Sequence, residues 1–179
     1  PSVTSDQVFI RLKGNIDLPH EVDFLLQTGV DGIGLMRSEY MFLNRRDLPS
    51  EDEQFEILRQ IVSRMEGKPI TFRTFDVGGD KSPDALHPPK TENPALGLRG
   101  IRFALKMPTL LKTQFRAVLR ACCFGDIRIL LPMVTSAEEI TSAKKLLAEC
   151  AEELREKSVP LPDCLPQLGV MIETPAAAL

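Results

Sequence analysis

Three charged residues suited to binding anions or metal ions stand at the ends of short apolar segments. Arg37 follows residues 32–36, Glu173 follows residues 168–172, and Arg73 lies in a third such segment. A guanidinium gives permanently charged, bidentate contacts to phosphate or carboxylate oxygens, and a carboxylate is a hard oxygen ligand for Mg²⁺. If these segments are parallel strands, their charged ends meet at one edge of the sheet. The pattern predicts a binding site for a phosphorylated acid.

Each of these features also has a purely structural interpretation. Arg37 can pair with Glu39 or Asp76, because ion pairs also occur at the rims of parallel barrels. Arg99 begins a predicted helix and can point toward the same edge of the sheet, or it can be a solvated surface arginine. The run Gly-Gly-Asp-Lys at residues 78–81 can direct backbone N–H groups at an anion, although glycine pairs more often mark ordinary turns. The sequence pattern alone leaves both interpretations open.

The histidines and cysteines form no recognisable catalytic or metal-binding pattern. His20 and His87 have no carboxylate or serine partner at a typical spacing, so both are interpreted as surface residues. The cysteines form no Cys-x-x-Cys pair and no metal-ligand spacing with the histidines, so they are interpreted as reduced, mostly buried thiols. The four are Cys122, Cys123, Cys150 and Cys164.

Composition indicates one globular domain without a nucleic-acid partner. The chain has 179 residues, of which 43% are hydrophobic and 26% charged, with a formal net charge of -3. This charge gives no overall attraction to nucleic acids or acidic membranes, so an anion site must be built locally. Because no apolar run reaches about 18 residues and no signal peptide is recognised, we expect no membrane insertion and a cytoplasmic location.

The predicted elements alternate between strands and helices. Residues 1–7 are polar and are interpreted as a linker. Short apolar runs predict strands, and apolar residues at helical spacing predict helices. The predicted strands cover residues 8–16, 32–36, 70–75, 127–134 and 168–172. The predicted helices cover residues 18–28, 50–67, 98–106 and 109–124, and a fifth follows residue 136.

Helix starts and one long loop complete this description. Asp17 is expected to cap the first helix, and serine with glutamate three positions later predicts capping boxes at Ser50 and Ser136. Residues 78–94 are rich in glycine and proline and form a predicted loop that is too long for a simple connector. Loops of this length are often functional.

This order of elements favours a parallel sheet covered by helices. A doubly wound sheet is expected to carry a GxGxxG turn after its first strand, whereas residues 14–17 read Gly-Asn-Ile-Asp. We therefore predict a TIM (β/α)8 barrel over residues 8–179. A complete barrel needs eight strands and about 250 residues, so five strands predict an incomplete one. Its open edges lead us to expect association or domain swapping.

Four segments, in order, resemble motifs of the phosphoenolpyruvate-utilising enzymes. Residues 32–40 (GIGLMRSEY) resemble their GIGLxRTE segment, with Ser38 in place of the usual threonine. Residues 73–81 (RTFDVGGDK) are similar to the RTxDxGGDK motif of phosphoenolpyruvate-protein phosphotransferase, enzyme I of the bacterial sugar phosphotransferase system. Residues 92–102 (ENPALGLRGIR) and 170–178 (VMIETPAAA) resemble the same subfamily.

The resemblance implies roles for the charged residues. It implies that Arg37 and Arg73 hold the phosphoryl group of phosphoenolpyruvate, that Arg99 assists, and that Glu173 is one of two carboxylate ligands of Mg²⁺. In this family the phosphoryl group moves to a histidine on a separate N-terminal domain, and then to a small histidine-containing phosphocarrier protein. Neither histidine of this chain matches that motif. The resemblance also implies a homodimeric parent protein.

The family pattern continues past this chain with an Asn-Asp pair that completes the Mg²⁺ site, a further arginine, and a cysteine proposed to protonate the enolate. We therefore expect this chain alone to be inactive and to bind phosphoenolpyruvate weakly. Two alternatives stay open. One is a dikinase or phosphoenolpyruvate synthase acting on pyruvate and ATP, against which the run at residues 78–81 argues. The other is a non-catalytic assembly module.

Overall fold

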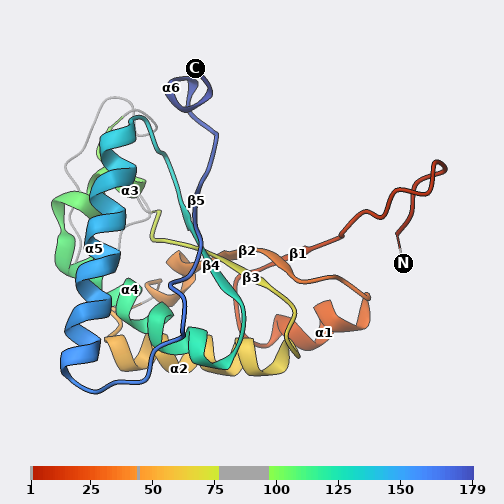
Figure 1. The fold of residues 1–179 in the computed structure, drawn as a ribbon, viewed down its shortest axis with the longest axis horizontal. Coiled ribbons are helices and arrows are strands. Elements are labelled where there is room, and N and C mark those ends of the chain that lie inside the picture. The colour runs from red at the N-terminus through yellow and green to blue at the C-terminus, as the bar shows by residue number, and fades with distance from the viewer. Residues whose placement is uncertain (1, 44, 77–96) are drawn as a thin grey trace.

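Five parallel strands form one sheet. The computed structural model of the chain describes residues 2–43, 45–76 and 97–179. In this part of the chain the strands lie in the order β1-β2-β3-β4-β5, so each strand pairs with its neighbour in the sequence (Figure 1). This arrangement confirms the predicted α/β class and is that of an incomplete (β/α)8 barrel. The strands are β1 (Gly14–Ile16), β2 (Ile33–Arg37), β3 (Ile70–Arg73), β4 (Ile127–Leu131) and β5 (Leu168–Val170).

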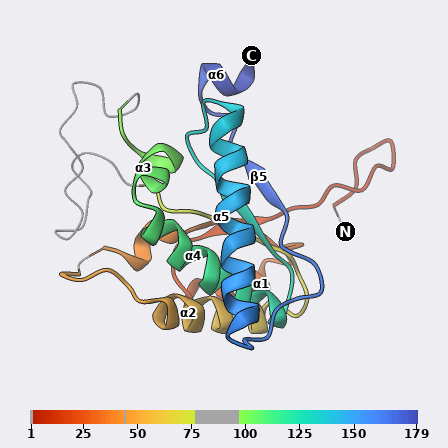
Figure 2. The same ribbon diagram turned by 60° about the vertical axis from the view of Figure 1, so that its left-hand side comes forward.

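Helices connect these strands and cover one face of the sheet. Figures 1 and 2 show the long helix α5 lying beside α4, with α2 on the same side of the strands. None of the described helices is long and apolar enough to cross a membrane. The helices are α1 (Glu21–Gln27), α2 (Glu51–Arg64), α3 (Gly100–Lys106), α4 (Pro108–Ala121), α5 (Ala137–Glu156) and α6 (Pro175–Ala178), and two 3-10 turns are η1 (Ser38–Met41) and η3 (Cys122–Phe124).

The hydrophobic core lies between the sheet and these helices. Successive side chains of a strand point to opposite faces. In β4, Ile127, Ile129 and Leu131 are buried, whereas Arg128 and Leu130 are only partly buried. Strand β3 alternates in the same way. The sheet thus has an apolar face toward the helices and a second, more polar face, which becomes the interior of a barrel.

Both predicted capping boxes are confirmed. At the start of α2, the Ser50 side chain accepts a hydrogen bond from the Glu53 N–H, and the Glu53 carboxylate accepts one from the Ser50 N–H. Ser136 and Glu139 make the same reciprocal pair at the start of α5. Because these bonds form within four consecutive residues, the sequence was sufficient to predict them.

The predicted first strand begins too early. Residues 8–12 are exposed and outside the sheet, and β1 is only Gly14–Ile16. Phe9 instead forms an antiparallel bridge with Val3, so the chain folds back on itself there and pairs locally rather than with β2. The N-terminal segment consequently extends away from the sheet in both Figures 1 and 2. The division into a linker at residues 1–7 and a barrel from residue 8 stays a prediction.

The prediction that Asp17 caps the first helix is wrong. Helix α1 begins at Glu21, with His20 at its N-cap and no side-chain cap bond. The Glu21 carboxylate accepts hydrogen bonds from the N–H groups of Asp17 (2.7 Å) and Leu18 (2.8 Å), and these bonds are the main reason that its pKa is lowered. The Asp17 carboxylate is therefore left to bind elsewhere.

Strand β4 is also shorter than predicted. Strand β4 ends at Leu131 because Pro132 has no N–H and Met133 adopts a positive φ of 58°. The predicted loop at residues 78–94, with the run at 78–81 and His87, lies outside the described residues.

The prediction of mostly buried thiols is only partly correct. The cysteines are free, but Cys123 and Cys164 are exposed. Burial raises the pKa of Cys122 to about 12 and that of Cys150 to about 11, so both thiols stay protonated near neutral pH.

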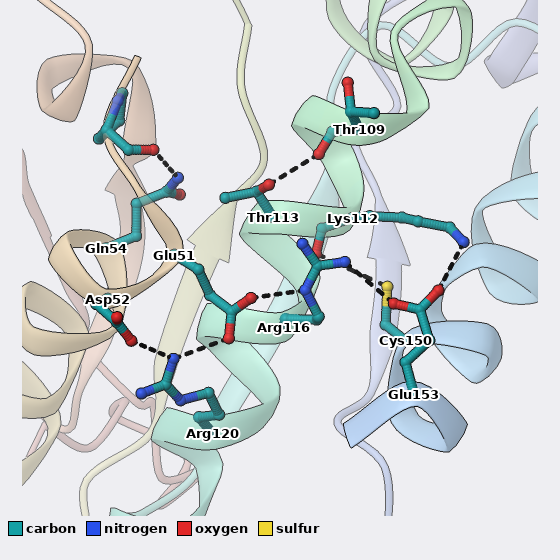
Figure 3. Close-up of polar contacts among 11 residues, drawn as sticks. Glu51, Asp52, Gln54, Thr109, Lys112, Thr113, Arg116, Arg120, Cys150 and Glu153 are labelled. Carbon is teal, nitrogen blue, oxygen red and sulfur yellow. Dashed lines mark hydrogen bonds and ion pairs between the residues drawn. The ribbon is translucent and has the colours of Figure 1, made fainter. Parts of the chain in front are cut away.

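Ion pairs join the outer surfaces of α2, α4 and α5 (Figure 3). From α4, Arg116 contacts Glu51 of α2 (2.6 Å) and Glu153 of α5 (3.2 Å). Lys112, one turn away, lies 3.0 Å from the same Glu153. Arg120 extends the cluster to Glu51 at 2.8 Å. These pairs connect three helices that are distant in the sequence and add a modest contribution to how they pack over the sheet.

The substitution Glu153→Gln tests this cluster. A hydrogen bond from Lys112 lowers the pKa of Glu153, so its ionised form stabilises the fold above the unfolded-state pKa, and this stabilisation is lost as pH falls through the lower folded-state pKa. Partly exposed pairs contribute at most about 1 kcal/mol, so we expect the melting temperature at neutral pH to fall by about 2 °C. Thermal unfolding at decreasing pH should show the difference in melting temperature between the variant and the unaltered protein disappearing in acid. Glu152→Gln, whose partner Arg155 lies on the same helix, is the control. An equal difference at every pH would contradict the prediction.

Candidate functional site

Arg37 and Arg73 lie side by side at the carboxyl ends of neighbouring strands. They are direct register partners in the parallel pairing of β2 with β3. Residues that pair in register point to the same face of a sheet, here the face away from the helices. The side chain of Arg37 is 39% exposed and that of Arg73 is 12% exposed. Two guanidiniums therefore share one edge of the sheet.

Arg37 is held by the segment that follows β1. Its Nε atom lies 2.8 Å from Oδ1 of Asp17, and its guanidinium lies 5.7 Å from the centre of the Tyr40 ring. The structural alternative correctly gave Arg37 an ion pair but named the wrong partners: Arg37 pairs with Asp17, and among the described residues Glu39 and Asp76 pair with other arginines.

Arg73 is more enclosed than Arg37 or Arg99. Its Nη2 atom forms an ion pair with Glu39, and its Nη1 atom lies 3.6 Å from Asp76 and 4.0 Å from the sulfur of Met171. Burial raises the pKa of Glu39; Arg73 opposes this effect and Asp76 adds to it. Among the described residues, no hydrogen-bond partner exists for the buried Nε of Arg73. Buried N–H groups in proteins are normally hydrogen-bonded, so this donor has an unused bonding capacity.

Asp76 connects Arg73 to Arg99. Its side chain is only 5% exposed, and its two oxygens accept hydrogen bonds from Nε (3.1 Å) and Nη2 (3.2 Å) of Arg99. Two parallel bonds of this kind fix the plane of a guanidinium. Arg99 precedes α3, so this pair brings a third cation to the edge that carries Arg37 and Arg73.

Glu173 follows β5 and is anchored to the segment that follows β4. Its Oε1 atom accepts a hydrogen bond from the N–H of Met133 (2.7 Å). The adjacent Thr174 is buried; its hydroxyl donates to the carbonyl of Val134 (2.6 Å) and accepts from the Ala177 N–H as the cap of α6. Among the described residues, no ion pair joins Glu173 to the three arginines. Glu173 thus lies on the same edge of the sheet with its carboxylate held apart.

Gly100 lets α3 approach this anchor closely. Its φ is +53°, and a Cβ atom built on it would lie 2.7 Å from Cβ of Met133 and 3.1 Å from the Pro132 carbonyl oxygen. That carbonyl accepts a hydrogen bond from the Ile101 N–H (3.1 Å). Only glycine fits both the backbone conformation and the space. The contact joins the start of α3, which follows Arg99, to the residue that holds Glu173.

The donors at this edge fit one part of a Mg²⁺ site. Within the described ranges, no group of three or more histidine, cysteine and acidic side chains gathers around a common point. Glu173 offers one exposed carboxylate, and Mg²⁺ is commonly bound through one or two carboxylates together with substrate phosphates. Guanidinium groups such as those at this edge are suited to complementary contacts with phosphate oxygens.

Sequence patterns missed several residues of this edge. Asp17 was assigned to a helix cap, and nothing in the sequence suggested that Met133 takes a positive φ. Gln114 is fully buried and bonds to the ends of β2 and β3. A polar residue beside Leu111 and Phe115, on the apolar side of a predicted helix, was a signal that could have identified it.

Gly100→Ala is expected to lower the unfolding free energy by about 2 kcal/mol or more, because the left-handed conformation and the collision with Met133 both oppose a Cβ atom. Denaturant unfolding measures this change. Gly67→Ala is the matched control, since Gly67 has a φ of +81° but a Cβ atom added there would have no other atom within 4 Å. Equal losses in the two variants would show that the contact with Met133 contributes nothing.

Comparisons with known proteins agree with this geometry. The family description "PEP-utilising enzyme, PEP-binding domain" matches residues 1–179. A phosphoenolpyruvate-protein phosphotransferase of Geobacillus stearothermophilus is 42% identical over 178 residues, covering 99% of this chain and 31% of the relative. The protein of that name from Cupriavidus necator is 44% identical over 182 residues, covering 100% and 31%. The chain therefore spans about a third of these relatives, and it belongs to the PEP-utilising enzymes, within their PEP-binding domain.

Proposed function

We propose that the complete protein transfers the phosphoryl group of phosphoenolpyruvate to a histidine on another of its domains and releases pyruvate. The observation that carries this proposal is the register pairing of Arg37 with Arg73 at the carboxyl edge of the sheet. The names of the relatives support phosphotransfer to a protein rather than a dikinase reaction. We also propose that the complete protein is a cytoplasmic homodimer. In this proposal it passes the phosphoryl group to a small histidine-containing phosphocarrier protein and serves sugar transport.

The arginines bind and orient the phosphoryl group. Arg37 and Arg73 point to the same face from adjacent strands, so their N–H groups can contact different oxygens of one phosphate. Arg99 reaches the same edge through Asp76 and supplies a third contact. During transfer, the bond between phosphorus and the enolate oxygen breaks while a bond to the histidine nitrogen forms, and the enolate then takes up a proton to become pyruvate. Fixed guanidiniums stabilise the charge on the transferring oxygens.

A divalent cation has an electrostatic reason to bind here. The three arginines face four carboxylates, those of Asp17, Glu39, Asp76 and Glu173. The edge therefore has no formal excess of positive charge among its described residues, although its ligand is strongly anionic. Bound Mg²⁺ would supply that charge and polarise phosphoryl and enolate oxygens. We propose Glu173 as one of its ligands and expect this chain alone to be inactive.

The substitution Arg73→Lys in the complete protein tests the phosphate contact. Lysine keeps the charge but loses the planar fork and the Nε–H, so we expect phosphoenolpyruvate to bind about tenfold or more weakly, measured by calorimetry. Arg128→Lys is the control, because Arg128 lies on the same sheet but pairs in register with Thr71, two residues before Arg73. Unchanged affinity in Arg73→Lys would contradict the proposed function.

Glu173→Gln tests the metal assignment separately. The glutamine oxygen can still accept the Met133 N–H, so the fold should keep its melting temperature without metal. Loss of the negative charge should weaken Mg²⁺ or Mn²⁺ binding by about tenfold or more in calorimetric titration. Asp126→Asn, at the opposite end of β4, should leave metal binding unchanged. If Glu173→Gln binds the metal as tightly as the unaltered protein, Glu173 is not a ligand.

A further inference from the structure

A glutamine from the helical layer holds together the two strand ends that carry the arginines. Gln114 lies on α4 and is fully buried. Its Oε1 atom accepts a hydrogen bond from the backbone N–H of Phe75 (2.9 Å), and its Nε2 atom donates one to the hydroxyl of Ser38 (3.1 Å). Ser38 and Phe75 are themselves buried. One amide therefore joins the segment after β2 to the segment after β3.

The bonds of Gln114 are directed to residues next to the charged side chains of the site. Ser38 lies between Arg37 and Glu39 in the sequence, and Phe75 directly precedes Asp76. Arg73 in turn pairs with both Glu39 and Asp76. Fixing Ser38 and Phe75 thus fixes the backbone from which Arg37, Arg73 and the two carboxylate partners of Arg73 project.

The same amide helps to set where β3 ends. The Thr74 N–H still donates to Leu130 of β4 (3.0 Å), but the next N–H, that of Phe75, donates to Gln114. The chain leaves the sheet at this point. A buried amide in an apolar layer is costly unless its groups are bonded, and here both ends of the amide have a partner. An apolar side chain would fill the space but would bond neither to the Phe75 N–H nor to the Ser38 hydroxyl.

We propose that Gln114 is a positioning residue for phosphoenolpyruvate binding, which sets the spacing and direction of Arg37 and Arg73 without touching the ligand. This inference rests on the proposed function. Groups that orient ligand-binding side chains affect affinity strongly, because small displacements of charged contacts are costly. The effect of Gln114 should therefore appear in ligand affinity and not only in stability.

A second buried glutamine provides a matched control. Gln54 on α2 is 1% exposed, and its Nε2 atom donates to the carbonyl of Pro49 (3.0 Å) at the start of its own helix (Figure 3). It matches Gln114 in residue type and burial, but its hydrogen bond does not reach the edge that carries the arginines, and its buried Oε1 has no partner among the described residues. Methionine is similar to glutamine in length and lacks its polar groups, so Gln54→Met and Gln114→Met each remove a buried amide, and only Gln114→Met removes bonds to the strand ends.

The experiment measures phosphoenolpyruvate affinity by calorimetry and melting temperature in the complete protein. We expect only Gln114→Met to raise the dissociation constant, by about tenfold, and the melting temperatures report separately how each variant affects stability. Equal affinities of Gln114→Met and the unaltered protein would overturn the inference, and so would an equal weakening by Gln54→Met.

Two further variants keep the test decisive. If Gln114→Met does not fold, Ser38→Ala removes one of the two bonds and leaves the Phe75 bond intact; we expect a several-fold loss of affinity, and no loss would overturn the inference. Arg73→Lys separates the two hypotheses. If Arg73→Lys weakens binding and the Gln114 and Ser38 variants do not, only the positioning role fails. If Arg73→Lys itself has no effect, the proposed function fails.

Discussion

The parallel register of β2 and β3 places two positive charges side by side, and carboxylates in the rest of the site compensate these charges. Arg37 and Arg73 are direct partners, and like charges opposite each other on neighbouring strands repel. The segments after β1, β2 and β3 each supply one carboxylate, from Asp17, Glu39 and Asp76 respectively. The arginines are thus charge-compensated within the fold. They are also held in fixed directions, which favours binding of a phosphate.

This compensation has consequences for the ligand. Asp76 is shared between Arg73 and Arg99, so the two guanidiniums are connected through one nearly buried carboxylate. Glu39 is enclosed, and burial raises its pKa, so desolvation opposes its ionised form even beside Arg73. Glu173 is kept away from these pairs by the Met133 N–H. The edge therefore keeps the arginines, which we propose bind the anion, apart from Glu173, which we propose as a cation ligand.

The helical layer supports this edge from behind. Gln114 reaches from α4 to the ends of β2 and β3, while Gly100 brings the start of α3 against the turn after β4. On the outer side, Arg116 and its neighbours connect α4 to α2 and α5 (Figure 3). Helix α4 is therefore fixed on two sides, by ion pairs outside and by a buried amide inside. Its inner side contacts the ends of β2 and β3 through Gln114.

Local chemistry determined much of this fold, and so the sequence was enough to predict it. Alternation of short apolar strands with amphipathic helices indicated a parallel barrel, and Ser50 and Ser136 marked two helix starts through bonds within four residues. Strand ends with Arg37, Arg73 and Glu173 indicated the edge where a phosphorylated acid can bind. These features depend on spacing along the chain, which the sequence contains.

Contacts between distant segments were decided only by the tertiary structure. Residues 8–12 read as a strand, but a local turn back to Val3 removes them from the sheet. Asp17 has the composition of a helix cap, yet Glu21 binds the free N–H groups and Asp17 turns to Arg37. Gln114 meets Ser38 across 76 positions of the sequence. Each outcome depends on which of several chemically adequate partners comes close in space, and spacing along a chain does not contain that choice.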